Sequence, residues 1–169
     1  MRPCSGGSWR VLAIGNTIID TVLTMPRIPV DDKVFVDSKR SFVGGQGANA
    51  AQGMALLGMH VSFLTRIGDD DDGLRAQKHF KACGLDLTHC LVIPGALTMS
   101  ACVTVATATQ QRSCLMHRDP AMFEGDVSSA LAEVDLSRFD VVYTDGYQLD
   151  LALPLARAAA ERGLPVLAD

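Results

Sequence analysis

The residues of this chain best suited to chemistry form a glycine cluster that ends in a polar side chain, Gly44-Gly45-Gln46-Gly47-Ala48-Asn49. Glycines at the start of a helix let backbone amides approach a ligand closely. Asn49 offers both a donor and an acceptor, which suits a ligand rich in hydroxyl groups. The alternative is a turn before a tightly packed helix, but three glycines and an asparagine exceed what a turn requires. The cluster therefore predicts a small-molecule site.

A second candidate is Asp20, which lies shortly after the apolar run 9–14. The region just past the carboxyl end of a central strand is where open α/β sheets bind ligands. A carboxylate there can accept hydrogen bonds from two neighbouring hydroxyls. Taken alone, Asp20 could also serve as a turn or cap residue. Its pairing with the glycine cluster favours a role in ligand binding.

The segment Gly45–Ala50 also reads as GxGxxA, the dinucleotide-binding pattern. Arg66 lies where an NADP-type enzyme could hold a ribose phosphate. The pattern should, however, follow the first buried strand, and that strand leads instead into Gly15-Asn16-Thr17. NAD(P) binding is therefore a remote alternative.

The acidic run Asp69–Asp72 resembles a metal site, but consecutive carboxylates on a loop cannot all face one ion, and the calcium-loop spacing is missing. Capping of a helix by Asp71 or Asp72 explains the run more simply. The histidines are dispersed, which favours surface or packing roles over zinc ligation: they are His60, His79, His89 and His117. We expect no metal site in this chain.

The composition predicts one soluble globular domain. The chain has 169 residues, 48% of them hydrophobic and 20% charged, with a formal net charge of -4. No run of Lys or Arg supports nucleic acid as a partner, and no window approaches the roughly 20 apolar residues that span a membrane. The five cysteines are scattered and read as reduced thiols. These features together predict a cytoplasmic protein.

Hydrophobic patterns predict an α/β fold with a parallel sheet. Helices are expected at about 48–57, 72–82 and 150–161, and buried strands at 9–14, 61–65, 139–144 and 164–168. The last strand is followed only by Asp169, so it is expected either to lie at a protected edge or to belong to the front part of a longer fold, which we favour.

Two further segments, around 33–43 and 99–117, mix apolar and polar residues instead of running apolar throughout. Such alternation marks strands with one face in water. Two ribbons of this kind predict a small β flap that stands off the main sheet and acts as a lid. The lid segments are expected at about 21–43 and 98–117.

Four motifs in order resemble the N-terminal half of a ribokinase-like (phosphofructokinase B type, PfkB) carbohydrate kinase. They are Gly15-Asn16 through Asp20, the glycine cluster, Ile67-Gly68-Asp69-Asp70 with Gly73, and Tyr143-Thr144-Asp145-Gly146-Tyr147. The resemblance covers the chain from about residue 9 onward. It implies that residues 1–169 form part of a three-layer αβα domain with a small β lid, and that the C-terminal ATP-binding half is absent.

The resemblance implies that Asp20, Gly45 and Asn49 hold sugar hydroxyls, with Gly44 in the same set. Asp32 occupies a place similar to that of a lid carboxylate in some relatives, although Asp31 or a solvated turn would also fit. In a separate likeness, Arg112 matches a basic lid position of ketohexokinase-like members, as does the stretch from Arg118-Asp119-Pro120 to Val134-Asp135-Leu136. This favours a ketose or related furanose as the sugar.

The activity that the resemblance implies is transfer of the ATP γ-phosphoryl group to a sugar hydroxyl. The family's catalytic Asp belongs to a later GAGD-type motif that these residues do not contain. ATP and Mg²⁺ are expected for the full-length family member, and neither for this half alone. The alternative is a non-catalytic sugar-binding fragment, and the lid is expected to allow a homodimer.

Overall fold

The computed structural model describes residues 8–169, so the expected thiol of Cys4 lies outside the described residues. Strands and helices alternate along the chain, as predicted for an α/β fold. The elements are β1 (Arg10–Ile14), β2 (Ile18–Met25), β3 (Ser38–Gly44), α1 (Gln46–Leu56), β4 (His60–Leu64), β5 (Arg66–Gly68), α2 (Asp71–Ala82), β6 (Leu91–Ile93), β7 (Ser100–Ala106), β8 (Arg112–His117), η1 (Pro120–Phe123), α3 (Ser128–Ala132), η2 (Leu136–Arg138), β9 (Val141–Thr144), α4 (Leu149–Glu161) and β10 (Val166–Ala168).

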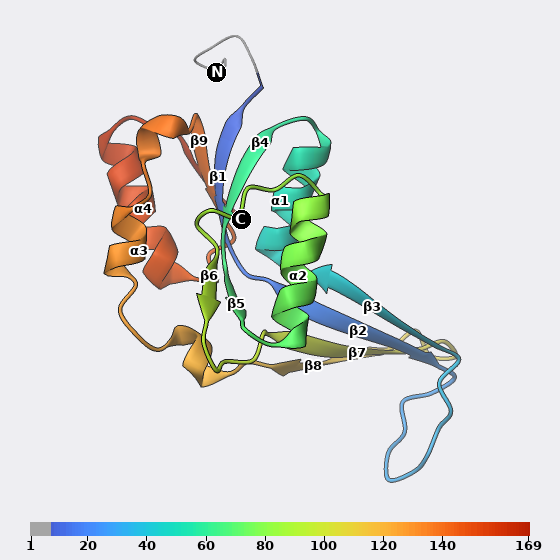
Figure 1. The fold of residues 1–169 in the computed structure, drawn as a ribbon. Coiled ribbons are helices and arrows are strands. Elements are labelled where there is room, and N and C mark those ends of the chain that lie inside the picture. Colours follow the sequence, from blue (N-terminus) through green and yellow to red (C-terminus); the bar gives the residue numbers. More distant parts are fainter. Residues whose placement is uncertain (1–7) are drawn as a thin grey trace.

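Four parallel strands form the central sheet in the order β10-β9-β1-β4. Helices α1 and α2 lie on one side of this sheet, and α3 and α4 lie on the other (Figure 1). In β1, Val11 and Ala13 pack in the core shared with α1 and α2, while Leu12 and Ile14 pack in the core shared with α4. Burial on both faces explains why the sequence shows these strands as apolar runs. All four predicted sheet strands are confirmed.

The three predicted helices are α1, α2 and α4, and each begins within two residues of the expected position. Helices α1 and α2 are followed by Gly58 and Gly84, whose φ angles are 86° and 81°. This left-handed conformation is the one that favours glycine at the end of a helix.

The cap of α2 corrects one expectation, because the capping residue is Asp70 and not Asp71 or Asp72. The Asp70 carboxylate accepts hydrogen bonds from the N–H of Gly73 at 2.9 Å and from the hydroxyl of Thr98 at 2.6 Å. Burial acts to raise the pKa of Asp70, but these hydrogen bonds lower it below its ordinary value. Asp71 and Asp72 lie in the first turn, where the helix dipole favours negative charge.

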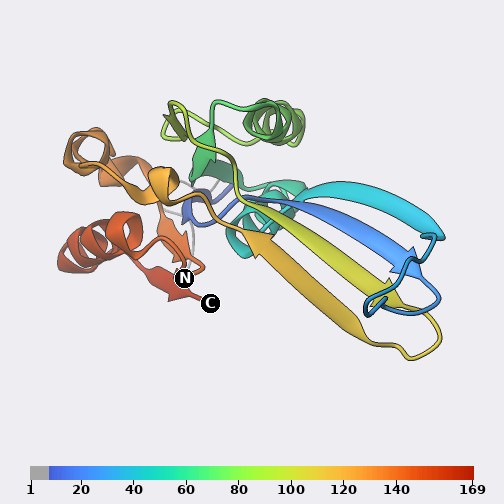
Figure 2. The same cartoon turned by 90° about the horizontal axis from the view of Figure 1, so that it is seen from below.

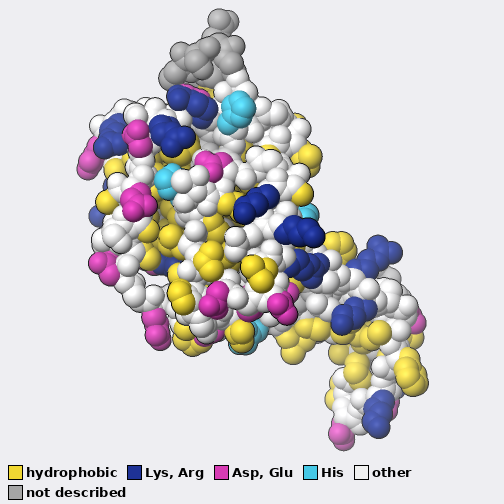
Figure 3. Space-filling model, in the orientation of Figure 1, with side chains coloured by type: hydrophobic (Ala, Val, Ile, Leu, Met, Phe, Trp, Pro, Cys, Tyr) yellow, Lys and Arg dark blue, Asp and Glu magenta, His cyan; other side chains and the backbone are white. Residues whose placement is uncertain are grey.

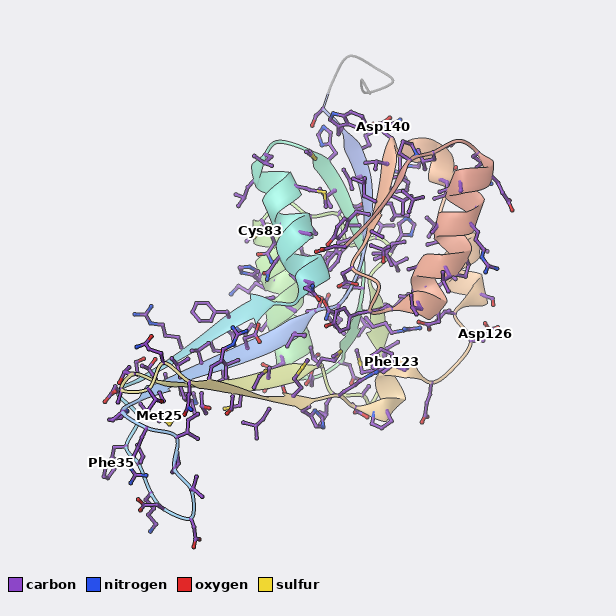
Figure 4. All side chains as sticks on the ribbon, turned by 180° about the vertical axis from the view of Figure 1, so that it is seen from behind. Met25, Phe35, Cys83, Phe123, Asp126 and Asp140 are labelled. Atoms are coloured by element: carbon purple, nitrogen blue, oxygen red, sulfur yellow. The ribbon has the colours of Figure 1, made fainter. Side chains whose placement is uncertain are left out.

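The flap is a separate four-stranded sheet in the order β3-β2-β7-β8. It projects away from the central sheet and its helices (Figure 2). The loop that joins β2 to β3 carries Phe35 and extends beyond the end of β2 at Met25 (Figure 4). Because side chains alternate along a strand, one flap face carries Asp20 and the apolar residues beside it in register: these include Val22, Phe42, Val103 and Met116.

Smaller elements escaped the sequence analysis. β5 and β6 form a separate parallel pair of three residues each, and η1, α3 and η2 lie between the flap and β9. Segments of three to five residues are too short to show a hydrophobic period. Within residues 8–169, no helix combines the length and the apolar character that crossing a membrane demands.

Candidate functional site where the flap meets the central sheet

The carboxylate of Asp145 ties together the elements that build the candidate site. Its Oδ2 atom accepts hydrogen bonds from the backbone N–H groups of Asn16 and Gly47, each at 2.8 Å. Its Oδ1 atom accepts a hydrogen bond from the N–H of Tyr147 at 3.0 Å. Asp145 follows β9, Asn16 follows β1, and Gly47 lies in the first turn of α1. One buried carboxylate therefore sets how α1 leaves the carboxyl edge of the sheet.

Glycines allow α1 to approach β1 this closely. A Cβ atom added at Gly47 would lie 2.5 Å from the Cα of Gly15. Gly45 has a φ of 101°, and a Cβ there would lie 2.7 Å from the carbonyl oxygen of Asn16. The glycine cluster is therefore required by backbone packing at this edge, independently of any ligand.

The first amides of α1 are used inside the protein. The N–H of Gly47 donates to Asp145, that of Ala48 to the carbonyl of Asn16, and that of Asn49 to the carbonyl of Gly45. The expectation that amides at this helix start face a ligand is wrong for these three. The place that a phosphate takes at an open helix N-terminus is filled here by the carboxylate of Asp145.

Two findings count against a dinucleotide site. The glycine cluster follows β3 of the flap, whereas the dinucleotide pattern follows the first strand of the parallel sheet. Arg66 is 2% exposed, and its guanidinium pairs with Asp150, with Nη1 3.0 Å from Oδ1. The positive charge of Arg66 is therefore paired with Asp150 inside the protein, and it is not presented to a ribose phosphate.

Asp20, Gly44 and Asn49 converge at the junction of the flap and α1. Asp20 is the third residue of β2, Gly44 is the last of β3, and Asn49 is exposed in the first turn of α1. A Cβ added at Gly44 would lie 2.6 Å from Oδ2 of Asp20 and 3.8 Å from Oδ1 of Asn49. The missing side chain at Gly44 thus leaves room for two polar groups that face the same point. Partial burial raises the pKa of Asp20 above its ordinary value.

Asp32 and Arg112 lie away from this cluster. Asp32 is exposed in the loop between β2 and β3, where it pairs with Arg27, and this hydrogen bond lowers the pKa of Asp32. Arg112 begins β8 on the same flap face as Asp20, in the row of Thr24. That row is four residues from Asp20, or about 13 Å along the flap.

Two features of the described residues bear on ATP and Mg²⁺. Within residues 8–169, no group of three or more His, Cys, Asp or Glu side chains could hold a metal ion. The start of α1 cannot take a phosphate, because Asp145 already accepts the hydrogen bond of Gly47 there. What this edge presents is a carboxylate and an amide, which are suited to neutral hydroxyl groups.

Sequence reasoning missed the roles of Asp145 and Gln148. The motif that contains Asp145 was noted only for its resemblance to a family, and Gln148 was not singled out. Gln148 is 3% exposed and donates a hydrogen bond from Nε2 to the carbonyl oxygen of Gly15 at 3.1 Å. Both side chains are buried beneath the site, and they bind partners more than 90 residues away in the chain. The one available signal was that both polar residues follow within four positions of the predicted strand 139–144.

A helix-covered parallel sheet, with polar groups gathered at its carboxyl edge and a β flap beside them, is typical of α/β proteins that bind small molecules at that edge. The chain belongs to the pfkB family of carbohydrate kinases, since the family model matches residues 9–169. The expected ribokinase-like α/β fold is confirmed: the structure matches that of Arabidopsis thaliana ribokinase, complexed with ribose and ATP, with a TM-score of 0.81 at 20% sequence identity.

Two curated relatives are similar in sequence. The ATP-dependent ribose-1-phosphate kinase of Halopiger xanaduensis is 26% identical over 161 residues, which are 95% of this chain and 53% of that protein. The 5-dehydro-2-deoxygluconokinase of Geobacillus thermodenitrificans is 31% identical over 108 residues, which are 64% of this chain and 31% of that protein. The Arabidopsis ribokinase match covers 96% of this chain and 53% of the other. The chain thus spans about half the length of the relatives that match it almost from end to end.

Proposed function

We propose that this chain is the sugar-binding half of an ATP-dependent carbohydrate kinase, which transfers the γ-phosphoryl group of ATP to a sugar hydroxyl. The observation that carries the proposal is the convergence of Asp20 and Asn49 on the open space at Gly44. Within residues 8–169, no hydrogen bond occupies either of these two side chains. Their acceptors and donors are therefore free for the hydroxyl groups of a sugar.

Each residue has a separate role in this proposal. The carboxylate of Asp20 accepts hydrogen bonds from two sugar hydroxyls, and Asn49 both donates and accepts. Gly44 and Gly45 give the sugar access, since a side chain at Gly44 would collide with Asp20. Asp32 and Arg112 supply polar contacts from the flap as it closes over the sugar. The likeness of Arg112 to a basic lid position of ketohexokinase-like members favours a ketose or related furanose as the sugar.

The chemical step requires more than these residues. This half orients the acceptor hydroxyl and excludes water beneath the flap, which are two main contributions to phosphoryl transfer. In full-length members of the family, the base, the ATP site and the Mg²⁺ site belong to the half that this chain does not span. We place the protein in the cytoplasm, in keeping with its scattered free thiols.

The test is a calorimetric titration of the 169-residue chain with a panel of ketoses and furanoses. Asp20→Ala should weaken binding of the preferred sugar by about tenfold or more, since two hydrogen bonds to a charged group are lost. Asp70→Ala is the matched control, because Asp70 makes hydrogen bonds within the fold. It should lower the melting temperature and leave the sugar affinity unchanged. Equal loss of affinity in both variants would refute the site assignment.

The second candidate is a non-catalytic sugar-binding module. It is favoured by the closed start of α1, where Asp145 accepts the hydrogen bond of Gly47 that a phosphate would otherwise take. The two candidates differ in turnover. A full-length gene product that binds sugar and consumes no ATP in the presence of Mg²⁺ fits the module, whereas sugar-dependent release of ADP by the full-length gene product fits the kinase.

We further propose that two copies pair through their flaps. The flap face that carries Asp20 exposes Phe42 and Met116, which are 49% and 55% exposed. Hydrophobic side chains gather along the flap in Figure 3. An apolar surface of this kind is more stable against a partner than in water. Light scattering should give a mass near twice 18.0 kDa, and Phe42→Asp should return the protein to a monomer.

A further inference from the structure

Exposed basic side chains form a stripe that runs along α2 and onto the flap. Arg75, Lys78 and Lys81 recur every three residues, so they lie along one side of the helix. Lys39 of β3 continues the row onto the flap, beside Arg75. Figure 3 shows Lys and Arg side chains in a line over α2 and the flap. These four residues are called the basic stripe below.

The positive charge of the basic stripe is not neutralised by ion pairs. Within residues 8–169, none of its four side chains takes part in one. The chain as a whole is acidic, with a formal net charge of -4, so the stripe is a local concentration of positive charge. Like charges held close together repel one another, and an anion bound among them relieves that repulsion.

A first hollow, of about 630 Å³, lies between α2 and the flap. Lys39, Arg75 and His117 line it together with a single carboxylate, that of Asp72. Its flap residues all belong to the face opposite Asp20, because side chains alternate along each strand: they include Thr21, Lys39, Ser41, Ser100 and His117. The hollow is therefore separated from the candidate sugar site by the thickness of the flap.

A second hollow, of about 570 Å³, lies on the other side of Arg75. Arg75, Lys78 and His79 line it, and no acidic residue is among its described lining residues. Ser41 lines both hollows, as Arg75 does. Each hollow thus brings two members of the basic stripe to a serine hydroxyl.

Two hydrogen bonds between Arg75 and Ser41 separate the hollows. Nη1 of Arg75 donates to Oγ of Ser41 at 2.7 Å, and Nη2 donates to the carbonyl oxygen of Ser41 at 2.9 Å. A guanidinium group has five N–H donors, so three remain for a ligand. Because Oγ of Ser41 accepts a hydrogen bond here, its own hydrogen is left to donate. Arg75 and Ser41 can therefore hold an anion while they hold each other.

From these contacts we infer that the basic stripe binds a small anion with at least two phosphate groups, one in each hollow, with Arg75 between them. Guanidinium, ammonium and hydroxyl donors match the oxygens of phosphate. Both volumes lie within the roughly 300 to 1,000 Å³ of small-ligand pockets, which favours a compact anion over an extended acidic peptide. The inference does not depend on the proposed function, because it concerns the opposite face of the flap.

Such an anion joins the flap to the body of the protein. α2 packs into the core of the central sheet through Ala76 and Phe80, whereas Lys39 and Ser41 belong to the flap. A ligand shared by Lys39 and Lys78 adds to the two hydrogen bonds that already connect β3 to α2. The bound anion therefore holds β3 against α2.

The first experiment is a calorimetric titration of the 169-residue chain in the absence of Mg²⁺. The probes are inorganic phosphate, pyrophosphate, tripolyphosphate and hexaglutamate. Pyrophosphate or tripolyphosphate should bind about tenfold more tightly than inorganic phosphate, because a second phosphate adds charge-assisted hydrogen bonds. Equal affinity for the three phosphates, or no binding of any, overturns the inference. Tighter binding of hexaglutamate than of tripolyphosphate overturns it in favour of an acidic peptide.

Lys39→Gln and Arg40→Gln are a matched pair, because each removes one positive charge from adjacent positions of β3. Lys39 lines the first hollow, whereas Arg40 lies in the row of Val22, on the other face of the flap. Lys39→Gln should weaken pyrophosphate binding by about three- to fivefold, as should Lys78→Gln in the second hollow. Arg40→Gln should change it by less than about twofold. Equal losses in Lys39→Gln and Arg40→Gln would mean that net charge alone attracts the anion, which rejects the site.

Hydrogen exchange tests the connection between α2 and the flap. Pyrophosphate should slow exchange of the β3 amides in the unchanged protein, and it should slow them less in Lys39→Gln. Binding of pyrophosphate with unchanged exchange in β3 contradicts an anion shared by the two elements. A chain that binds pyrophosphate and no sugar refutes the proposed function and leaves this inference in place, and binding of sugar without pyrophosphate does the reverse.

Discussion

Replacing two glycines of α1 by alanine should change stability in opposite directions. Gly47 and Gly53 belong to the same helix, and alanine is the better helix former at both positions by about 0.5 to 1 kcal/mol. Their surroundings differ. A Cβ added at Gly53 meets nothing within 4 Å, whereas one at Gly47 would lie 2.5 Å from the Cα of Gly15 and 2.8 Å from Oδ2 of Asp145.

The magnitude for Gly47→Ala follows from these distances. Carbon atoms in ordinary contact are about 3.5 to 4 Å apart, so the start of α1 must move by about 1 Å. Overpacking of this kind costs about 1 to 3 kcal/mol. The shift also weakens the charge-assisted hydrogen bond from Gly47 to Asp145, worth about 1.5 to 3 kcal/mol. After the gain in helix propensity, the net loss is about 2 to 4 kcal/mol.

Urea denaturation, followed by far-ultraviolet circular dichroism, measures both variants under the same conditions. Gly53→Ala should be more stable than the unchanged protein by about 0.5 to 1 kcal/mol. Gly47→Ala should be less stable by the amount above and should melt about 5 to 15 °C lower. Its sugar affinity should also fall, because the movement displaces Asn49. Equal effects at the two positions would refute the close packing of α1 on β1.

Three further perturbations test other contacts. Asp145→Asn should cost about 2 to 3 kcal/mol of unfolding free energy, since an amide cannot accept every hydrogen bond that the carboxylate accepts, and an unchanged urea midpoint would contradict this. Asp150→Asn should cost about 2 to 3 kcal/mol, because it removes the negative charge that pairs with the buried guanidinium of Arg66. Arg66 lowers the pKa of Asp150, so this stability is present above the ordinary pKa of aspartate and is lost as the pH falls through the lowered value, as acid titration of the two proteins should show. Burial raises the pKa of Asp20, so sugar affinity should fall on acidification at a pH above 3.8, and a midpoint below that value in calorimetry would contradict the burial of Asp20.

The central sheet could be predicted because its physics is local. Residues 11–14 are apolar without interruption because both faces of β1 are covered, and this pattern is visible in the sequence alone. The flap was also predictable, because its segments mix apolar and polar residues, although burial does not alternate along its strands and every residue of β8 is exposed. The sequence pattern paired Asp20 with the glycine cluster, and in the structure a Cβ added at Gly44 would lie 2.6 Å from Oδ2 of Asp20. Their role in holding a sugar stays a prediction.

Long-range polar contacts could not be predicted in the same way. Asp145 binds amides that are 129 and 98 positions away, and no periodicity records such a partner. The charge of Arg66 suggested exposure to a ligand, but the pair with Asp150 pays for its burial. Asp70 was read as an ordinary member of an acidic run because its partner Thr98 belongs to a distant loop. Each of these roles depends on tertiary geometry.

The position of Asp20 on β2 has a mechanical consequence. Asp20 is part of the flap itself, whereas Asn49 belongs to α1 and moves with the central sheet. A bend at residues 15–17 would therefore carry Asp20 away from Asn49, and the eight residues of β2 act as a lever about 26 Å long. A rotation of about 10° at its base displaces the far end by about 5 Å. A sugar bound by both Asp20 and Asn49 would hold the base of β2 against α1. Its hydroxyl groups would then restrain the motion of the entire flap.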